Sequence, residues 1–187
     1  MLPDKILPFF WDQKNVCVWF AGCSGGEEVY SFKIIWEMLK KKHTSLPALK
    51  ATACDLNPEN LIRAQNGIYS PSSLKEAKPE ILSRFFEKGP TRKSLAVKSF
   101  LKNNITWEKF DLLKDQIPSD AYDIVFLRNN ILTYSDGDLK RKGFNHAVSA
   151  LADAGILIIG AKEQKPESIN NFESFELPYM FQKQGYS

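Results

Sequence analysis

The sequence holds few residues of the kinds that build metal centres or disulfide frameworks. It has only two histidines and three cysteines, and the cysteines Cys17, Cys23 and Cys54 show no CxxC spacing. Neither a structural zinc site nor a disulfide scaffold is therefore expected, and reduced cysteines are typical of a cytoplasmic protein. His43 and His146 have no sequence neighbours that suggest a metal site or a catalytic role.

Long hydrophobic runs and a strong charge of one sign are also missing. No apolar stretch is long enough to cross a bilayer, and the N-terminus shows no basic region followed by a continuous apolar core. The formal net charge is only +3, and no basic stripe with interleaved aromatic residues occurs. We therefore expect neither membrane insertion nor nucleic-acid binding. The length fits a single domain over residues 1–187.

The stretch VCVWFAGCSGGEEVYS, residues 16–31, organises the rest of the chain. Its first six residues, 16–21, are nearly all apolar and predict a strand buried on both faces of a parallel sheet. Three glycines follow within residues 22–26, where they allow a tight turn and close approach of the backbone. Apolar residues at helical spacing over 29–39 then predict a helix. Strand, glycine turn and helix form the first half of a nucleotide-binding βαβ unit.

The same loop argues against phosphate binding. GCSGG matches neither GxGxxG nor GxxxxGK[ST], which excludes a P-loop. Glu27 and Glu28 stand in the first turn of the helix, where they would repel a pyrophosphate. They favour a nucleoside that carries positive charge, such as S-adenosylmethionine with its ammonium and sulfonium groups. A plain glycine turn with solvated glutamates is the alternative.

Asp55 follows the second predicted strand, residues 49–54. Its distance from the glycine turn is about what one helix and a return strand need. A carboxylate at this place can accept hydrogen bonds from both ribose hydroxyl groups. The alternative role, capping the next helix at 59–65, is already filled by Asn57 and Pro58. We therefore assign Asp55 to the nucleoside site.

Two segments depart from the alternation of strand and helix. Residues 66–102 contain two expected helix starts, at Ser70 and Lys78, and predict a mostly helical excursion. Near the N-terminus, the aromatic cluster of residues 9–11 is expected to pack over an edge of the domain. A remnant of a lid above the cofactor is the alternative for this cluster.

The second half of the chain returns to regular alternation. Strands are predicted at 105–110, 121–127 and 155–160, a helix at 136–151, and one or two final strands within 171–182. This pattern predicts an α/β fold with a doubly wound, mostly parallel sheet that binds ligands at the carboxyl ends of its strands. The polar residues expected at those ends are Glu28, Asp55, Asp111 and Asn129.

Six motifs now stand in order: GCSGGEEVYS, TACDLN, RAQNGIYSPSSL, FDLL, DIVFLRNNILTY and GILIIGAKE. Together they resemble the S-adenosylmethionine-binding domain of the CheR-type protein-glutamate methyltransferases, over about residues 16–163. The resemblance implies a Rossmann-like methyltransferase fold and S-adenosylmethionine as cofactor, with S-adenosylhomocysteine as product. It also implies methyl transfer to a glutamate carboxylate of an acceptor protein.

The resemblance further implies which residues form the site. Glu28, Asp55 and the pairs Asp111–Leu112 and Arg128–Asn129 match family positions that contact the cofactor. To these we add three residues beside them as candidate cofactor contacts: Gly22, Ser24 and Leu56. Tyr134 matches the family's active-site tyrosine.

The chain also departs from the family pattern. The family usually has asparagine at the position of Asp111, and one extra residue lies between Asn129 and Tyr134. The last motif reads GAKE instead of GHSE. We expect the family's helical N-terminal domain, whose arginine faces the methyl-transfer site, to be missing, together with its small β-subdomain. A different methyl acceptor, or a binding module without catalysis, therefore remain alternatives, whereas a dinucleotide oxidoreductase is disfavoured.

Overall fold

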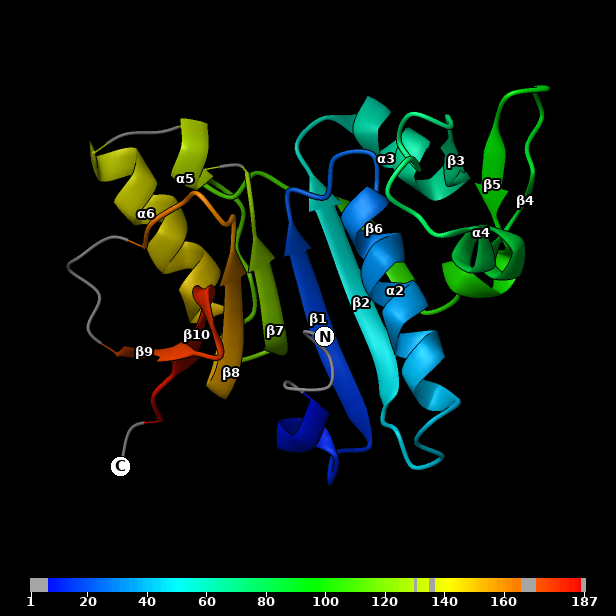
Figure 1. The fold of residues 1–187 in the computed structure, drawn as a ribbon. Coiled ribbons are helices and arrows are strands. Elements are labelled where there is room, and N and C mark those ends of the chain that lie inside the picture. Colours follow the sequence, from blue (N-terminus) through cyan, green and yellow to red (C-terminus); the bar gives the residue numbers. More distant parts are fainter. Residues whose placement is uncertain (1–6, 130, 135–136, 166–170, 186–187) are drawn as a thin grey trace.

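A computed structural model describes residues 7–129, 131–134, 137–165 and 171–185. Its main element is a seven-stranded sheet with the order β6-β2-β1-β7-β8-β10-β9 (Figure 1). The strands are β1 (Asn15–Ala21), β2 (Ala48–Asp55), β6 (Ile105–Lys109), β7 (Tyr122–Leu127), β8 (Leu151–Ile159), β9 (Phe172–Phe175) and β10 (Leu177–Lys183). The first five in the order are parallel, and β10 and β9 run antiparallel at one edge. The predicted fold class, a mostly parallel α/β sheet, is confirmed.

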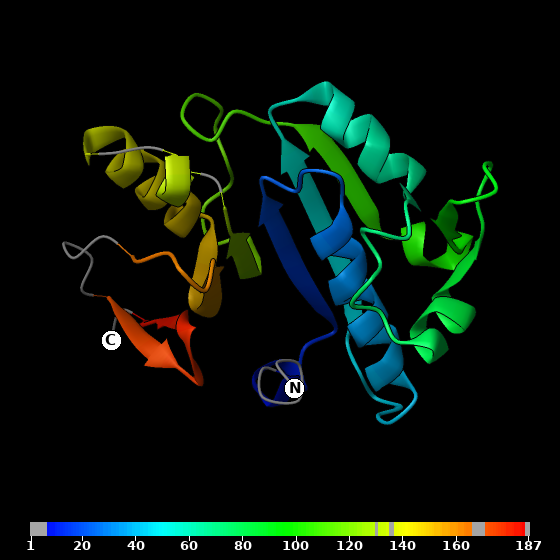
Figure 2. The same cartoon turned by 45° about the horizontal axis from the view of Figure 1, so that its top comes forward.

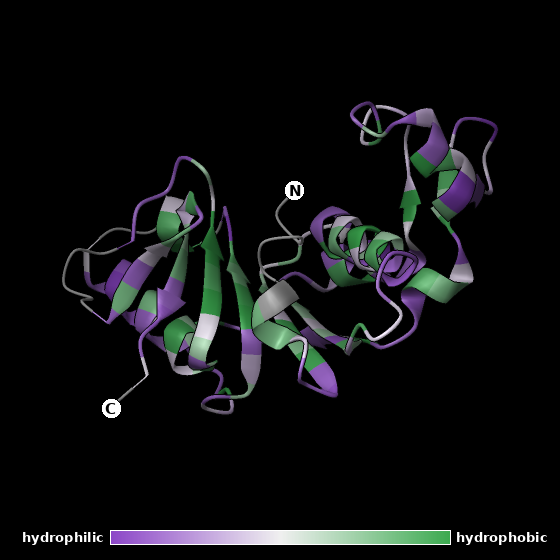
Figure 3. Ribbon diagram, turned by 60° about the horizontal axis from the view of Figure 1, so that its bottom comes forward, coloured by the Kyte–Doolittle hydropathy of each residue, from purple (hydrophilic) through white to green (hydrophobic). Residues whose placement is uncertain are grey.

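Central strand β1 is buried on both faces, as its apolar run predicts. Val18 and Phe20 pack on one face of the sheet, together with α2 (Glu27–Lys40). Trp19 packs on the other face with α6 (Gly137–Ser149). Figure 3 shows the hydrophobic colour concentrated in the strands of this sheet. Because helices cover both faces, the ends of the strands are where a ligand can enter.

The helix that follows β2 begins where the sequence predicts. In α3 (Pro58–Asn66), the Asn57 side chain accepts a hydrogen bond from the amide of Glu59 at 2.9 Å, and Pro58 occupies the first turn. This cap leaves Asp55, just before it, with other partners. The short helix α5 (Ile131–Tyr134) lies between β7 and α6.

Residues 66–102 are not mostly helical, and this prediction is wrong. They form a small antiparallel sheet of the order β3-β5-β4, with β3 (Ile68–Tyr69), β4 (Phe86–Lys88) and β5 (Leu95–Val97). The helical parts are α4 (Pro79–Phe85) and the 3-10 turn η2 (Ser99–Lys102), and the expected helix at Ser70 is a series of turns. Strands of two or three residues are too short to show an alternating pattern.

The small sheet stands beside α2 and α3, on the side away from β9 and β10 (Figure 2). This small sheet was not evident in the sequence. Tyr69 of β3 packs with Tyr30 of α2 in a shared apolar cluster. The small sheet is thereby attached to the helix that begins at the glycine loop.

The aromatic cluster near the N-terminus packs at the end of the sheet opposite the glycine loop. It includes the 3-10 turn η1 (Leu7–Phe10), in which Phe10 is buried. The ring of Phe9 packs edge-on against that of Phe175, with 5.0 Å between the ring centroids. The rings of Trp11 and His43 pack together, with 5.4 Å between their centroids. The packing role is therefore confirmed, and the lid alternative is wrong for these residues. Within the described ranges, no helix has the length and apolar character to cross a membrane.

Gly26 offers a test of how tightly the loop after β1 is packed. Its φ is +82°, and a Cβ there would lie 2.9 Å from Ala64 Cβ and 3.2 Å from Tyr69 Oη. We expect Gly26→Ala to lower the free energy of unfolding by about 1–3 kcal/mol, through backbone strain and contact together. Chemical denaturation measures this loss.

Gly137 is the matched control, because its φ is +53° but a Cβ there would meet nothing within 4 Å. Gly137→Ala should therefore report backbone strain alone and lower the free energy of unfolding by less than Gly26→Ala does. Equal losses in the two variants would contradict tight packing at Gly26.

Candidate functional site

The glycine loop is fixed to the end of the neighbouring strand. The amides of Gly22 and Cys23 both donate to the carbonyl of Cys54, at 3.0 and 2.7 Å. The amide of Ser24 donates to Asp55 Oδ2 at 2.8 Å, and Ser24 itself has a left-handed φ of 48°. The loop conformation is thus set by the last two residues of β2.

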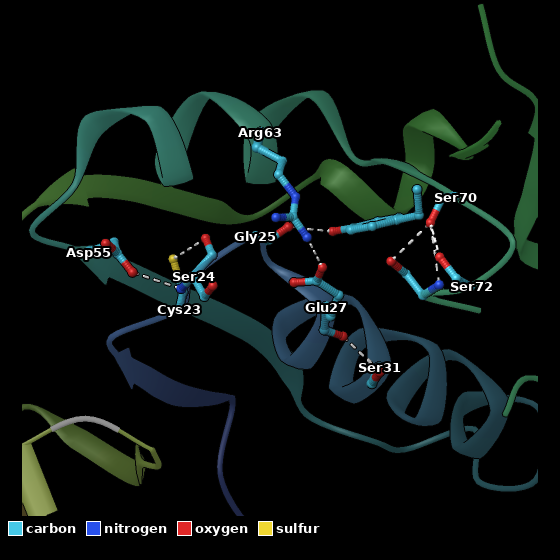
Figure 4. Close-up of polar contacts among 11 residues, drawn as sticks. Cys23, Ser24, Gly25, Glu27, Ser31, Asp55, Arg63, Ser70 and Ser72 are labelled. Atoms are coloured by element: carbon cyan, nitrogen blue, oxygen red, sulfur yellow. Dashed lines mark hydrogen bonds and ion pairs between the residues drawn. The ribbon is translucent and has the colours of Figure 1, made fainter. Parts of the chain in front are cut away.

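A second group of residues supports the loop from behind, as Figure 4 shows. Tyr69 of β3 donates its hydroxyl to the carbonyl of Gly25 at 2.8 Å in a buried position. Arg63 of α3 forms an ion pair with Glu27. A Cβ at Gly25 would lie 2.6 Å from the guanidinium carbon of Arg63, so a larger residue there would displace this side chain from its present position. Helix α3 and the small sheet together hold the loop from this side.

One cavity, of about 250 Å³, opens on the Asp55 side of the loop. It is lined by Ala21, Gly22, Cys54, Asp55, Leu56, Phe110, Asp111, Leu112, Leu113 and Ile131. Leu56 is 58% exposed although it is apolar, so a ligand in the cavity would cover it. The cavity offers an apolar slot between two carboxylates, which suits a nucleoside.

Asp55 has several partners in addition to Ser24. Its Oδ1 accepts from the amide of Asn57 at 2.9 Å and from Asn60 Nδ2 at 3.0 Å. A carboxylate offers about four acceptor positions, so these three hydrogen bonds leave about one for a ribose hydroxyl. Asp55 therefore supports the start of α3 as well as the loop, which corrects the expectation that Asn57 and Pro58 fill this role alone.

The opposite wall of this cavity is the loop after β6. Asp111 Oδ1 accepts from the amide of Leu113 at 3.0 Å, and Lys114 lies 3.1 Å from Oδ2. The hydrogen bond from Leu113, then the one from Lys114, holds the pKa of Asp111 below its usual value. Asp111 is therefore an ionised acceptor at neutral pH, suited to a donor such as the adenine amino group. His146 Nδ1 lies 2.7 Å from the carbonyl of Leu112 and ties this loop to α6.

A second cavity, of about 630 Å³, lies on the other side of Gly22. It is lined by Gly22, Cys23, Ser24, Glu27, Glu28, Ser31, Phe32, Ile35, Phe126, Arg128 and Asn129. At its polar end Glu28 forms an ion pair with Arg128. Burial raises the pKa of Glu28, and the charge and hydrogen bond of Arg128 oppose that rise. Both glutamates of the helix start are thus paired with arginines, which corrects the expectation that they stand open to a cation.

All nine predicted cofactor contacts lie in the walls of these two cavities. Five line the first, Gly22, Asp55, Leu56, Asp111 and Leu112, and five the second, Gly22, Ser24, Glu28, Arg128 and Asn129. Their individual roles remain predictions. Tyr134 is the last residue of α5, and its side chain lies outside the described part of the structure.

Sequence reasoning missed the apolar lining. Phe110, Leu113 and Ile131 of the first cavity and Phe32, Ile35 and Phe126 of the second were not predicted. Phe110 and Leu113 flank predicted residues, so their position next to a strand end was an available signal. Phe32 and Phe126 look like core residues in sequence, and both are indeed nearly buried.

The two cavities meet at Gly22, and together they fit a nucleoside joined to an amino acid. The first offers apolar walls and a carboxylate acceptor at each side, and the second a carboxylate beside a guanidinium. An ammonium and a carboxylate on one ligand can each find an opposite charge there. No cluster of three or more metal-ligating side chains occurs among the described residues.

Comparison with known protein families agrees with this geometry. Residues 2–181 match the family model described as CheR methyltransferase, SAM binding domain. The chain belongs to this family. S-adenosylmethionine is therefore the cofactor of this CheR-family domain.

Relatives of the domain are chemotaxis methyltransferases. Chemotaxis protein methyltransferase 1 of Vibrio cholerae is 31% identical over 176 residues, covering 92% of this chain and 63% of that protein. The chemotaxis protein methyltransferase of Listeria innocua is 33% identical over 168 residues, covering 88% of this chain and 60% of that protein. The chain thus spans less than two thirds of the length of these relatives.

One similar solved structure is that of the [4+2]-cyclase SpnF. It has a TM-score of 0.50 at 13% identity and covers 84% of this chain and 43% of that one. This likeness concerns the fold alone.

The raised pKa of Glu28 gives the site a pH dependence. As the pH falls, its carboxyl group becomes protonated at a pH above the ordinary glutamate pKa of 4.5, and the neutral group no longer attracts an ammonium group. We expect affinity for S-adenosylhomocysteine to fall as the pH drops from neutrality toward this window. Glu28→Gln should remove the pH dependence and weaken binding at pH 7 by roughly 1.5–3 kcal/mol. Calorimetric titration at several pH values measures both effects.

Protonation of Glu28 has the opposite effect on the stability of the fold. Because the pKa of Glu28 is raised by folding, its contribution to stability is present at low pH and is lost as the pH rises through the folded pKa. Glu28→Gln should therefore not lower the unfolding midpoint at pH 7. The control is Glu37→Gln on the same helix, where the carboxylate pairs with Lys40 away from both cavities. If the affinity of Glu28→Gln for S-adenosylhomocysteine depends on pH as that of the wild type does, Glu28 is not part of the cofactor site.

His146 should act on cofactor affinity through the loop it holds. His146→Ala removes the hydrogen bond to the carbonyl of Leu112, and we expect binding of S-adenosylhomocysteine to weaken by about 0.5–1.5 kcal/mol. His146→Asn, which carries a donor near the position of Nδ1, should restore part of it. His43→Ala is the control, since His43 contacts Trp11 at the other end of the sheet. The same loss in both alanine variants would contradict the assignment.

Proposed function

We propose that this CheR-family domain transfers the methyl group of S-adenosylmethionine to a glutamate carboxylate of an acceptor protein. Its relatives carry the name chemotaxis protein methyltransferase, which supports a protein acceptor. The observation that carries the proposal is the volume of the second cavity together with its apolar lining.

Besides the ion pair of Glu28 and Arg128, the lining of this cavity contains an apolar wall. The wall is formed by Phe32 and Ile35 of α2 and by Phe126 at the end of β7. At about 630 Å³ it exceeds what the amino-acid end of the cofactor requires and leaves space for an acceptor side chain. Donor and acceptor can therefore share one cavity.

The chemistry needs positioning and little else. The cofactor supplies an electrophilic methyl group on a sulfonium, and a glutamate carboxylate is already ionised at neutral pH. A carboxylate oxygen forms the new C–O bond as the C–S bond breaks, and the electron pair stays on sulfur, so no proton moves. The task of the chain is to orient the two groups and exclude water, for which the apolar wall of Phe32, Ile35 and Phe126 is suited.

The small sheet is a second feature that supports a protein acceptor. Strand β4 pairs with β5 on one side, and among the described residues no strand pairs with its other edge. An extended peptide can add to such an edge through its backbone. The sheet is also linked to the cofactor loop, because Tyr69 of β3 donates to Gly25.

Tyr134 is proposed as the residue that faces the reacting groups. It ends α5, which follows directly on the strand end that carries Arg128 and Asn129. Its match to the family's active-site tyrosine supports this role.

The proposal is tested by methyl transfer from cofactor labelled in its methyl group, with lysate proteins as acceptors. We expect label in protein that base releases as methanol, because methyl esters are hydrolysed by base whereas methylated amines are stable. Tyr134→Phe should lower this transfer by about tenfold or more with cofactor affinity unchanged.

Three outcomes would contradict the proposal. Base-stable label would indicate an amine acceptor, and label only in small molecules would exclude a protein acceptor. Binding of the cofactor without transfer to any acceptor would identify a binding module.

A further inference from the structure

A single carboxylate joins three segments at the Arg128 side of the site. Glu163, in the turn after β8, accepts at Oε2 from the amide of Asn129 at 3.1 Å and from the amide of Gly160 at 2.7 Å. Its Oε1 accepts from the hydroxyl of Thr133 in α5. The donors thus come from the end of β7, the end of β8 and the helix that leads to Tyr134.

The backbone around this carboxylate is closely fitted to it. A Cβ at Gly160 would lie 2.6 Å from Glu163 Oε2 and 3.1 Å from Asn129 Oδ1, so a larger residue there would displace the carboxylate from its present position. Asn129 has a left-handed φ of 52°, which asparagine tolerates but which needs support from its surroundings. The turn itself is closed by a hydrogen bond from the amide of Glu163 to the carbonyl of Gly160 at 2.9 Å.

The strand end that Glu163 holds carries the residues of the second cavity. Arg128 precedes Asn129 directly and pairs with Glu28, and both Arg128 and Asn129 line the cavity. Glu163 itself is not among the lining residues of either cavity. Glu163 therefore acts on a ligand through the residues that it holds, Asn129 and α5, and through its negative charge, which adds to the effect of burial in raising the pKa of Glu28 in the cavity wall.

We propose that Glu163 is a positioning residue, which through its three hydrogen bonds holds Asn129, and with it the adjacent Arg128, and the helix α5 in the arrangement that binds the cofactor and faces the acceptor. The inference rests on the proposed function. It assigns a role to the last residue of GAKE.

Two substitutions separate the hydrogen bonds from the charge. Glu163→Ala removes all three acceptor contacts. Glu163→Gln keeps an oxygen for the amides of Asn129 and Gly160, and its NH₂ group can donate to the Thr133 hydroxyl, so the connections persist without the negative charge. Lys162→Ala is the matched control, because Lys162 is the exposed neighbour in the same turn.

We expect Glu163→Ala to weaken binding of S-adenosylhomocysteine by about tenfold and Glu163→Gln to stay within about threefold of the wild type. Amide hydrogen exchange in the protein without cofactor should be faster at Asn129 and Gly160 in the alanine variant only. Label transfer should fall in kcat as well as in affinity, since α5 leads to Tyr134. A residue that only stabilises the fold would change the unfolding midpoint and leave affinity and kcat unchanged.

The outcomes distinguish this inference from the function it rests on. If the wild type does not bind S-adenosylhomocysteine, the proposed function fails, whereas the exchange measurement still reports on the hydrogen bonds. If the wild type binds and transfers but Glu163→Ala does so equally well, the inference is wrong and the function stands. If Glu163→Gln is as impaired as Glu163→Ala, the charge and not the hydrogen bonds is responsible, which also overturns the proposal.

Discussion

The site depends on the carboxylate of Asp55, which lies where two parallel strands end together. The register pairs Ala21 of β1 with Cys54 of β2, so the residues that follow each strand are adjacent. Asp55 uses this place to accept hydrogen bonds from Ser24 in the glycine loop and from Asn57 and Asn60 at the start of α3. These hydrogen bonds fix the amide of Ser24 and the first residues of α3 to one carboxylate. Loop, helix and cavity wall therefore share one support.

Charge compensation defines what the site can bind. Glu28 is paired with Arg128, Glu27 with Arg63 and Asp111 with Lys114. A simple cation would have to compete with these basic side chains, and a simple anion with the acids. A zwitterion such as the amino-acid end of S-adenosylmethionine can instead replace both partners of the Glu28–Arg128 pair, leaving neither charge unpaired. Balanced pairs thus favour this cofactor more directly than the open acidic rim that the sequence suggested.

The centre of the large sheet could be predicted because β1, β7 and β8 each contain a continuous apolar run closed by a glycine or a polar residue. The polar residues at these ends were found for the same reason, since a strand end is visible in one sequence window. The small sheet was missed because β3, β4 and β5 have two or three residues each. Glu163 was missed because its contact with Asn129 spans 34 residues and joins two loops, a relation that no local pattern contains.

The two cavities differ in what they need from a ligand, and this bears on the acceptor. The first is the smaller, at about 250 Å³, and most of its lining is apolar. The second is wider, and the Arg128 side chain at its polar end is 37% exposed, so water reaches it. Methyl transfer to a carboxylate is favoured when the attacking oxygen loses its water shell. A small acid in this cavity would leave that water in place, whereas a protein surface that presents a glutamate would cover the exposed Arg128 side chain and displace the water. This displacement of water is the physical argument behind the proposed protein acceptor.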